Sequence, residues 1–249
     1  MKHAAIIELR NVGVSYTRRA GLMRGQKFWA LHDVSFDLRH GETLGVVGHN
    51  GAGKSTMLRL LAGIMAPDHG EVISRTERVS LLSLQAGFVP HLTGRENAIL
   101  SGILMGLSRR EMLERMQDII EFSELGEFID EAVRTYSSGM RARLGFAVAF
   151  QADPDVLLVD EILGVGDAGF REKSTLAMKE KIASNKTVVI VTHNPESITD
   201  LCNRMVWIHN GVTRAIGEPG ELLRQYQESF GHGSSRGVRV GEPKKAGVI

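Results

Sequence analysis

Gly48-His49-Asn50-Gly51-Ala52-Gly53-Lys54-Ser55 is the stretch of this 249-residue sequence that decides the fold. It satisfies the pattern G-x-x-x-x-G-K-[ST], in which a glycine-rich turn joins a strand to a helix and its backbone N–H groups surround phosphate oxygens. The flanking sequence fits, because Leu44 to Val47 is a short apolar run typical of a strand. Apolar residues then recur at helical spacing, at Met57, Leu58, Leu61 and Ile64. The stretch therefore predicts a binding site for a nucleoside triphosphate.

Individual residues of this turn have distinct predicted roles. Lys54 is expected to reach the β and γ phosphates, and the Ser55 hydroxyl is expected to ligate Mg2+. Further contacts with the nucleotide are predicted for the neighbouring residues His49, Asn50, Gly51, Ala52, Gly53 and Thr56.

Two buried-strand patterns later in the chain supply the remaining polar groups of such a site. Val156 to Val159 and Thr187 to Thr192 are rich in Val, Leu and Ile, as expected of a parallel sheet covered on both faces. Asp160 ends the first strand, where it can hold Mg2+, and Glu161 follows as the predicted general base for an attacking water. His193 follows the second strand and is predicted to contact the γ-phosphate and that water.

Composition restricts the partners and the compartment. Thirty Lys and Arg against 29 Asp and Glu leave a net charge of +1, so we expect no nucleic-acid partner. Cys202 is the one cysteine, which indicates a reducing, cytoplasmic compartment. The apolar run from Ala4 to Ile7 is too short for a signal peptide, and the apolar run from Leu144 to Phe150 is too short to cross a bilayer. Export and membrane spanning are therefore not expected.

Outside these strands, the sequence predicts three further regions: a pair of N-terminal strands, a helical middle and a hairpin. Antiparallel strands are expected over Ile6 to Tyr16 and Val34 to Arg39, joined by an exposed basic loop from Thr17 to Lys27. The middle is helical, since capping-box patterns occur at Thr93–Glu96 and Ser108–Glu111. One apolar helix face is expected to follow, made by Met112, Leu113, Met116, Ile119 and Ile120. A hairpin turn is expected at Asn210-Gly211.

Tyr136-Ser137-Ser138-Gly139-Met140 stands between the glycine-rich turn and the Asp160 strand, where ABC transporter ATP-binding subunits have their LSGGQ signature. The chain resembles that family over nearly its whole length. The resemblance implies the α/β class and the P-loop NTPase ABC ATPase fold: a parallel-sheet core, an N-terminal antiparallel β subdomain and an inserted helical subdomain at about residues 86–150. It also implies an ATPase domain over residues 1–230 and a flexible tail over 231–249.

The same resemblance implies further site residues. Ser137 and Gly139 would bind the γ-phosphate of ATP held by the P-loop of a second copy, so two copies would close around two ATP molecules. Gln85 resembles the Q-loop glutamine, which touches Mg2+, takes part in catalysis and senses the membrane partner. The stretch Gly164–Asp167 resembles the D-loop, and Tyr16 resembles the aromatic residue that stacks on adenine. Trp29 is a rival for that role, and core packing is open for either.

Three longer strings are similar to the ATP-binding subunits of polysaccharide exporters for O-antigen, capsule and wall teichoic acid. They are YSSGM (136–140), AGFVPHLTGREN (86–97) and DEILGVGDAGFREKS (160–174). This resemblance implies an ATPase coupled to export of a lipid-linked polysaccharide, peripheral on the cytoplasmic face of the inner membrane. Its partners would be two copies of a polytopic membrane subunit, contacted through a groove beside residues 86–135. A C-terminal carbohydrate-binding domain is not expected.

Several alternatives stay open. An ABC ATPase can export a different substrate or act as a soluble interaction protein in DNA repair or translation. A P-loop kinase or GTPase would share Gly48–Ser55 but would not need Tyr136–Met140 or His193. The basic residues Arg18, Arg19 and Arg24 either meet anionic lipid or the pyrophosphate of a lipid-linked glycan, or belong to a solvated surface loop.

Overall fold

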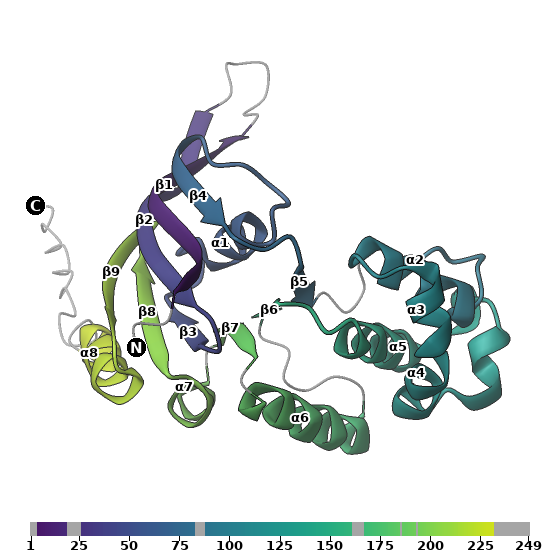
Figure 1. Ribbon diagram of the computed structural model, residues 1–249. Coiled ribbons are helices and arrows are strands. Elements are labelled where there is room, and N and C mark those ends of the chain that lie inside the picture. Colours follow the sequence, from purple (N-terminus) through teal and green to yellow (C-terminus); the bar gives the residue numbers. More distant parts are fainter. Residues whose placement is uncertain are drawn as a thin grey trace, which may run out of the picture.

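The computed structural model describes residues 4–18, 26–82, 88–160, 167–184, 186–192 and 194–231. Within these residues, nine strands form one mixed sheet in the order β4-β1-β2-β9-β8-β3-β7-β6-β5 (Figure 1). The strands are β1 (Ala5–Arg18), β2 (Gln26–Arg39), β3 (Thr43–Val47), β4 (His69–Ser74), β5 (Val79–Leu82), β6 (Val156–Asp160), β7 (Thr187–Val191), β8 (Arg204–His209) and β9 (Val212–Gly217).

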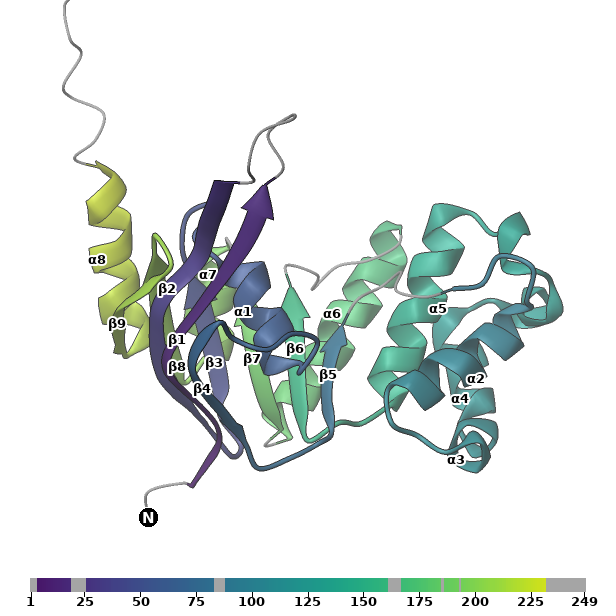
Figure 2. The same ribbon diagram turned by 90° about the horizontal axis from the view of Figure 1, so that it is seen from above.

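The helices either cover this sheet or gather beyond its β5 edge (Figures 1 and 2). Those packed on the sheet are α1 (Lys54–Leu61), α6 (Ala168–Ala183), α7 (Pro195–Leu201) and α8 (Pro219–Gly231). Those gathered at the edge are α2 (Gly94–Leu104), α3 (Arg109–Glu114), α4 (Met116–Ser123), the short η1 (Gly126–Asp130) and η2 (Val133–Thr135), and α5 (Ser138–Gln151). In the described parts of the chain, no helix combines the length and apolar character needed to cross a bilayer.

The parallel core is buried on both faces, as its unbroken apolar strands predict. Every residue of β3 and of β7 is buried. Val189 and Val191 pack with α1 on one face, while Val188 and Ile190 pack with residues of α5 to α8 on the other. Strands β3, β5, β6, β7 and β8 pair in parallel, so their carboxyl ends share one edge of the sheet.

The N-terminal strands are antiparallel as predicted, but the expected loop from Thr17 to Lys27 is wrong at both ends. Thr17 pairs with Lys27, and Arg18 pairs with Gln26. The ladder continues this far because the pair before it, Tyr16 and Phe28, consists of aromatic residues, which favour strands. Residues 19–25, with Arg19 and Arg24, lie outside the described residues.

Both predicted capping boxes are present, and two details of the helix prediction are wrong. Helix α1 ends at Leu61 because Gly63 takes φ +68°, which leaves Ile64 64% exposed rather than on the buried helix face. The predicted single helix from Met112 onward is divided at Arg115 into α3 and α4, and Leu113 is exposed.

A short backbone ladder joins two separate segments among the edge helices. Val133 N–H donates to Leu92 O at 2.9 Å, and Arg134 N–H donates to Pro90 O at 2.8 Å. Thr93 and Ala132 form a β-bridge next to the first of these bonds, and Gly94 N–H donates to Glu131 O at 3.1 Å beyond it. The segment that follows residues 83–87 is thereby fixed to the segment that leads into Tyr136.

Candidate nucleotide-binding site

The predicted phosphate-binding turn lies between the carboxyl end of β3 and the start of α1. Gly51 has φ +82° and Gly53, the N-cap of α1, has φ +102°, a region that favours glycine. A Cβ at Gly53 would also lie 2.6 Å from the Ala30 carbonyl oxygen. At Gly48 a Cβ would lie 2.4 Å from the Ile208 carbonyl oxygen. Glycine is therefore required at the first position by close packing and at the later two by the backbone conformation.

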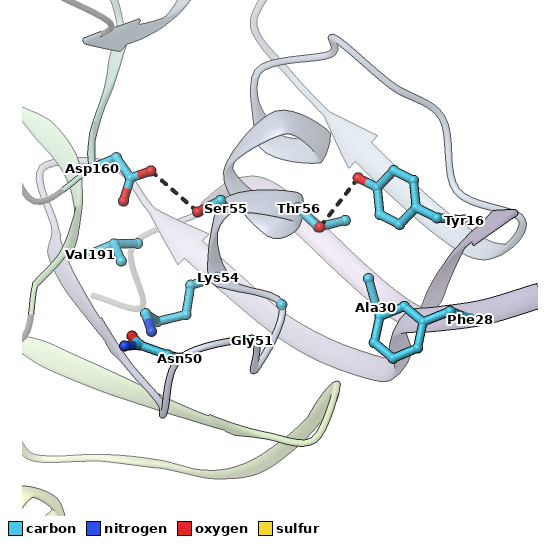
Figure 3. A pocket seen from close by; sticks show the side chains of 11 residues that line it. Tyr16, Phe28, Ala30, Asn50, Gly51, Lys54, Ser55, Thr56, Asp160 and Val191 are labelled. Carbon is cyan, nitrogen blue, oxygen red and sulfur yellow. Dashed lines mark hydrogen bonds between the residues drawn. The ribbon is translucent and has the colours of Figure 1, made fainter. Parts of the chain in front are cut away.

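The turn opens into a pocket of about 320 Å³ (Figure 3). Its lining comes from the turn, α1 and the ends of four strands. The lining residues are Tyr16, Phe28, Ala30, Asn50, Gly51, Gly53, Lys54, Ser55, Thr56, Asp160 and Val191.

The charged and hydroxyl groups lie at one end of this pocket. Lys54 Nζ donates to the carbonyl oxygens of Gly48 at 2.7 Å and His49 at 3.1 Å, which holds the ammonium group under the turn. Ser55 Oγ donates to Asp160 Oδ2 at 3.4 Å, so the hydroxyl and the carboxylate that the sequence separates by 105 positions meet here. The ammonium, the turn N–H groups and the N-terminus of α1 suit a polyphosphate.

The opposite end is aromatic, and the structure distinguishes Tyr16 from Trp29. Tyr16 lines the pocket, and its hydroxyl lies 3.3 Å from Thr56 Oγ1. Trp29 points to the other face of β2, where its ring packs edge-on against His69 with the ring centroids 5.2 Å apart. Phe28 also lines the pocket, a position that the sequence pattern did not indicate.

Outside the pocket, the hairpin of β8 and β9 contacts the phosphate-binding turn. His49 Nε2 lies 2.9 Å from Asn210 Oδ1, and Gly211 N–H donates to Ala52 O at 3.2 Å. Asn210 and Gly211 form the predicted turn between β8 and β9, with φ +49° and +75°. The hairpin thus contacts the phosphate-binding turn at two points.

The variant Asn210→Gly removes the amide that contacts His49 but keeps a residue that tolerates positive φ. We expect the KM for ATP to rise about three- to tenfold with little change in kcat, because one hydrogen bond to the turn is lost. Asn210→Asp, which retains an acceptor oxygen and tolerates the same backbone, is the control. Steady-state kinetics measure both, and an unchanged KM in the glycine variant would show that the hairpin does not position the turn.

Ser137 and Gly139 do not line this pocket; they lie at the start of α5, among the edge helices (Figure 2). Ser137 is exposed and caps α5, since its Oγ accepts from Met140 N–H at 3.1 Å. Tyr136 is buried, and its hydroxyl donates to the Phe128 carbonyl, which fixes the backbone just before Ser137. Helix α5 begins at Ser138, directly after this cap.

Other predicted site residues lie outside the described residues: Gln85, Glu161, Gly164 to Gly166, and His193. Asp167, the last residue of the predicted D-loop, is the N-cap of α6 and accepts from Phe170 N–H at 3.0 Å. That hydrogen bond lowers the pKa of the Asp167 carboxyl, so the cap is ionised at neutral pH.

The sequence profile described as "ABC transporter" matches residues 31–164. The O-antigen export system ATP-binding protein RfbB of Klebsiella pneumoniae is 46% identical over 209 residues, which cover 84% of this chain and 85% of RfbB. The teichoic acids export ATP-binding protein TagH of Listeria innocua is 43% identical over 203 residues, or 82% of this chain and 60% of TagH. These relatives confirm the predicted resemblance to polysaccharide-export subunits.

Solved structures confirm the predicted fold. A dimeric ATP-binding cassette in a post-hydrolysis state, bound to ADP and Pi, superposes with a TM-score of 0.70 at 26% identity, covering 86% of this chain and 98% of that one. An ATP-binding subunit of an ABC transporter gives a TM-score of 0.72 at 23% identity, covering 89% and 93%. The chain therefore belongs to the ABC transporter family, as an ATP-binding subunit whose ATPase activity is coupled to transport.

Proposed function

We propose that this chain supplies the ATP hydrolysis that exports a lipid-linked polysaccharide across the cytoplasmic membrane. The observation that carries the proposal is the similarity to an O-antigen export subunit along 84% of the chain, which includes the phosphate-binding turn and Asp160. Teichoic acid export subunits are similar over nearly as much of the chain. The shared cargo class of these relatives is a polysaccharide.

The residues divide the work of hydrolysis as follows. Lys54 and the turn N–H groups neutralise the phosphate oxygens, and Tyr16 stacks on adenine. Glu161, next to Asp160 at the end of β6, takes the proton of the attacking water. His193, after the end of β7, contacts the γ-phosphate from the adjacent strand. The parallel pairing of β3, β7 and β6, which brings their carboxyl ends to one edge of the sheet, supports these roles.

Mg2+ fits the oxygen donors at the phosphate end of the pocket. Ser55 Oγ and Asp160 Oδ2 converge there, and hydroxyl and carboxylate oxygens are ligands that Mg2+ accepts. Among the residues that the structure describes, His, Cys, Asp and Glu form no cluster of three that would hold a metal by themselves. We propose that Ser55, Asp160 and Gln85 hold the ion together with phosphate oxygens and water, and that the ion offsets phosphate charge.

The variant Asp160→Asn tests this metal assignment. Loss of the carboxylate charge should raise the Mg2+ concentration needed for half-maximal ATP hydrolysis by about tenfold or more. Asp118→Asn, on an exposed position of α4, is the matched control. Titration of hydrolysis with MgCl2 at saturating ATP measures the effect. Equal Mg2+ requirements in both variants would remove Asp160 from the metal site.

We further propose that two copies of the chain close face to face, each contributing Ser137 and Gly139 to the ATP held by the other. The position of Ser137 outside the pocket of its own chain supports this arrangement, as does the dimeric cassette with a similar fold. ATP favours closure because its γ-phosphate contacts both copies, and hydrolysis removes that contact. Asp167, with the rest of the D-loop, would join the two sites.

The membrane partner is proposed to be a pair of polytopic subunits that dock beside residues 86–135 and hold the chain on the cytoplasmic face of the membrane. The ATPase domain would span residues 1–230, with the tail at 231–249. Arg18, Arg19 and Arg24 either meet anionic lipid or a lipid-linked pyrophosphate, or belong to a solvated surface loop; their joint replacement by Ser, which should impair export but spare basal ATP hydrolysis, distinguishes the two.

Replacement of Lys54 by Ala in the organism of origin tests the export function. Surface polysaccharide should disappear and its lipid-linked precursor should accumulate inside the cell, while the protein still copurifies with a polytopic membrane subunit. Normal surface polysaccharide in an ATPase-dead strain would point to another exported substrate. Absence of any membrane partner would favour a soluble ABC ATPase that acts outside transport.

A further inference from the structure

Phe28 is an aromatic side chain of the nucleotide pocket that the phosphate chemistry leaves unused. Phe28 is 58% exposed, and Tyr16 beside it is 39% exposed. Both line the pocket that contains Lys54 and Asp160. Large aromatic side chains that remain exposed at the wall of a pocket point to a ligand that covers them.

The strand register places the two rings together. Tyr16 on β1 pairs directly with Phe28 on β2, and cross-strand partners project to the same face of a sheet. Ala30, two residues beyond Phe28, shares that face and is buried. Figure 3 shows the Tyr16 and Phe28 rings on either side of the Ala30 methyl group, with all three facing the pocket.

A second cavity of about 500 Å³ adjoins the same pair on the side of the strand ends. It is lined by Tyr16, Thr17, Gln26, Lys27 and Phe28. Tyr16 and Phe28 therefore border two hollows. The Trp29 ring, by contrast, is covered on its own face by His69 and by the Lys27 ammonium, which lies 4.5 Å from the ring centroid.

The two ends of the pocket match the two ends of ATP. Lys54, Ser55 and Asp160 form the end that suits phosphates and metal, and Thr56 connects it to Tyr16 through the 3.3 Å hydroxyl contact. The far end offers two rings and a methyl group, which bind a flat heterocycle by stacking and apolar contact. We propose that Phe28 contacts the purine base jointly with Tyr16, which makes the base subsite a two-ring site; this inference rests on the proposed ATP-binding site.

Binding of ADP and of inorganic pyrophosphate to the full-length chain tests the assignment, because only ADP carries the base and neither is hydrolysed. In Phe28→Ala, the Kd for ADP should rise about five- to tenfold, the effect of losing one exposed stacking partner, while the Kd for pyrophosphate stays the same. Phe28→Trp should restore or tighten ADP binding. Phe128→Ala is the matched control, since Phe128 is 59% exposed on η1 and lies outside the pocket.

Each outcome decides the inference. Equal weakening of ADP and pyrophosphate in Phe28→Ala, or unchanged ADP binding, would overturn it. If Phe28→Ala does not fold, Phe28→Leu keeps an apolar side chain without a ring and should still weaken ADP selectively. If the wild-type chain binds pyrophosphate and ADP equally well, no base subsite exists and the inference fails while a polyphosphate site remains. If the wild type binds neither, the proposed nucleotide function itself falls.

Discussion

Glu161→Gln should reduce kcat for ATP hydrolysis by about 10²- to 10⁴-fold, the usual contribution of a general base. Glutamine has nearly the size of glutamate but cannot accept the proton of the attacking water. Glu161 follows Asp160 directly in the sequence, and Asp160 Oδ2 lies 3.4 Å from Ser55 Oγ at the phosphate end of the pocket. The substitution should therefore leave ATP binding intact and stop the reaction at the bound nucleotide.

Accumulation of a closed pair is the second consequence of this substitution. ATP remains uncleaved, so the γ-phosphate contact between two copies persists and the dimer no longer reopens. Size-exclusion chromatography with ATP should show a dimer that disappears when ADP replaces ATP. Glu180→Gln, the same change at an exposed position of α6, should behave as wild type. Near-normal turnover of Glu161→Gln would move the base to another residue.

Mixing two inactive variants should restore activity if each ATP site is shared between copies. Lys54→Ala removes the phosphate-binding ammonium group. Ser137→Asp retains a side chain that caps α5 but places a negative charge against the γ-phosphate. Each variant alone should hydrolyse ATP at about 1% of the wild-type rate or less. An equal mixture should reach roughly a quarter of the wild-type rate, because half of randomly formed pairs contain one intact site of two.

The thermal melting temperature of Ser137→Asp provides the folding control for this mixture, since an aspartate cap should leave it near the wild-type value. Hydrolysis by the mixture should rise with the square of protein concentration at low concentration. Two outcomes count against the shared site: full activity of Ser137→Asp by itself, or a mixture no more active than its components. A strictly monomeric enzyme at full speed would exclude the transport mechanism proposed above.

The phosphate-binding turn, the buried strands and the capping boxes were predictable because each depends on residues close in sequence. Gly51 and Gly53 occupy backbone conformations that the motif itself implies, and Thr93 and Ser108 cap helices through contacts three residues away. Gly63 also carried a local signal that ends α1, which the apolar spacing of Ile64 outweighed in the prediction.

The aromatic end of the pocket was not predictable in the same way. Which of Phe28 and Trp29 faces the pocket depends on the pairing of β1 with β2, and that pairing shifts register between Leu9 and Val12 and twice more before Ser15. Each irregularity can change which face a residue occupies, so alternation along the sequence does not carry through. The contact between His49 and Asn210 spans 161 positions and likewise needs the folded sheet.

The ladder that joins Leu92 to Val133 and Pro90 to Arg134 has a mechanical meaning. Backbone hydrogen bonds hold these two segments together, so we expect them to move as one unit. Pro90, at one end of the ladder, follows residues 83–87 in the sequence, and Arg134, at its other end, lies three residues before Ser137. In the two-copy arrangement proposed above, a displacement of Pro90 would be passed through this ladder to Ser137, which would couple this segment to the contact between the copies.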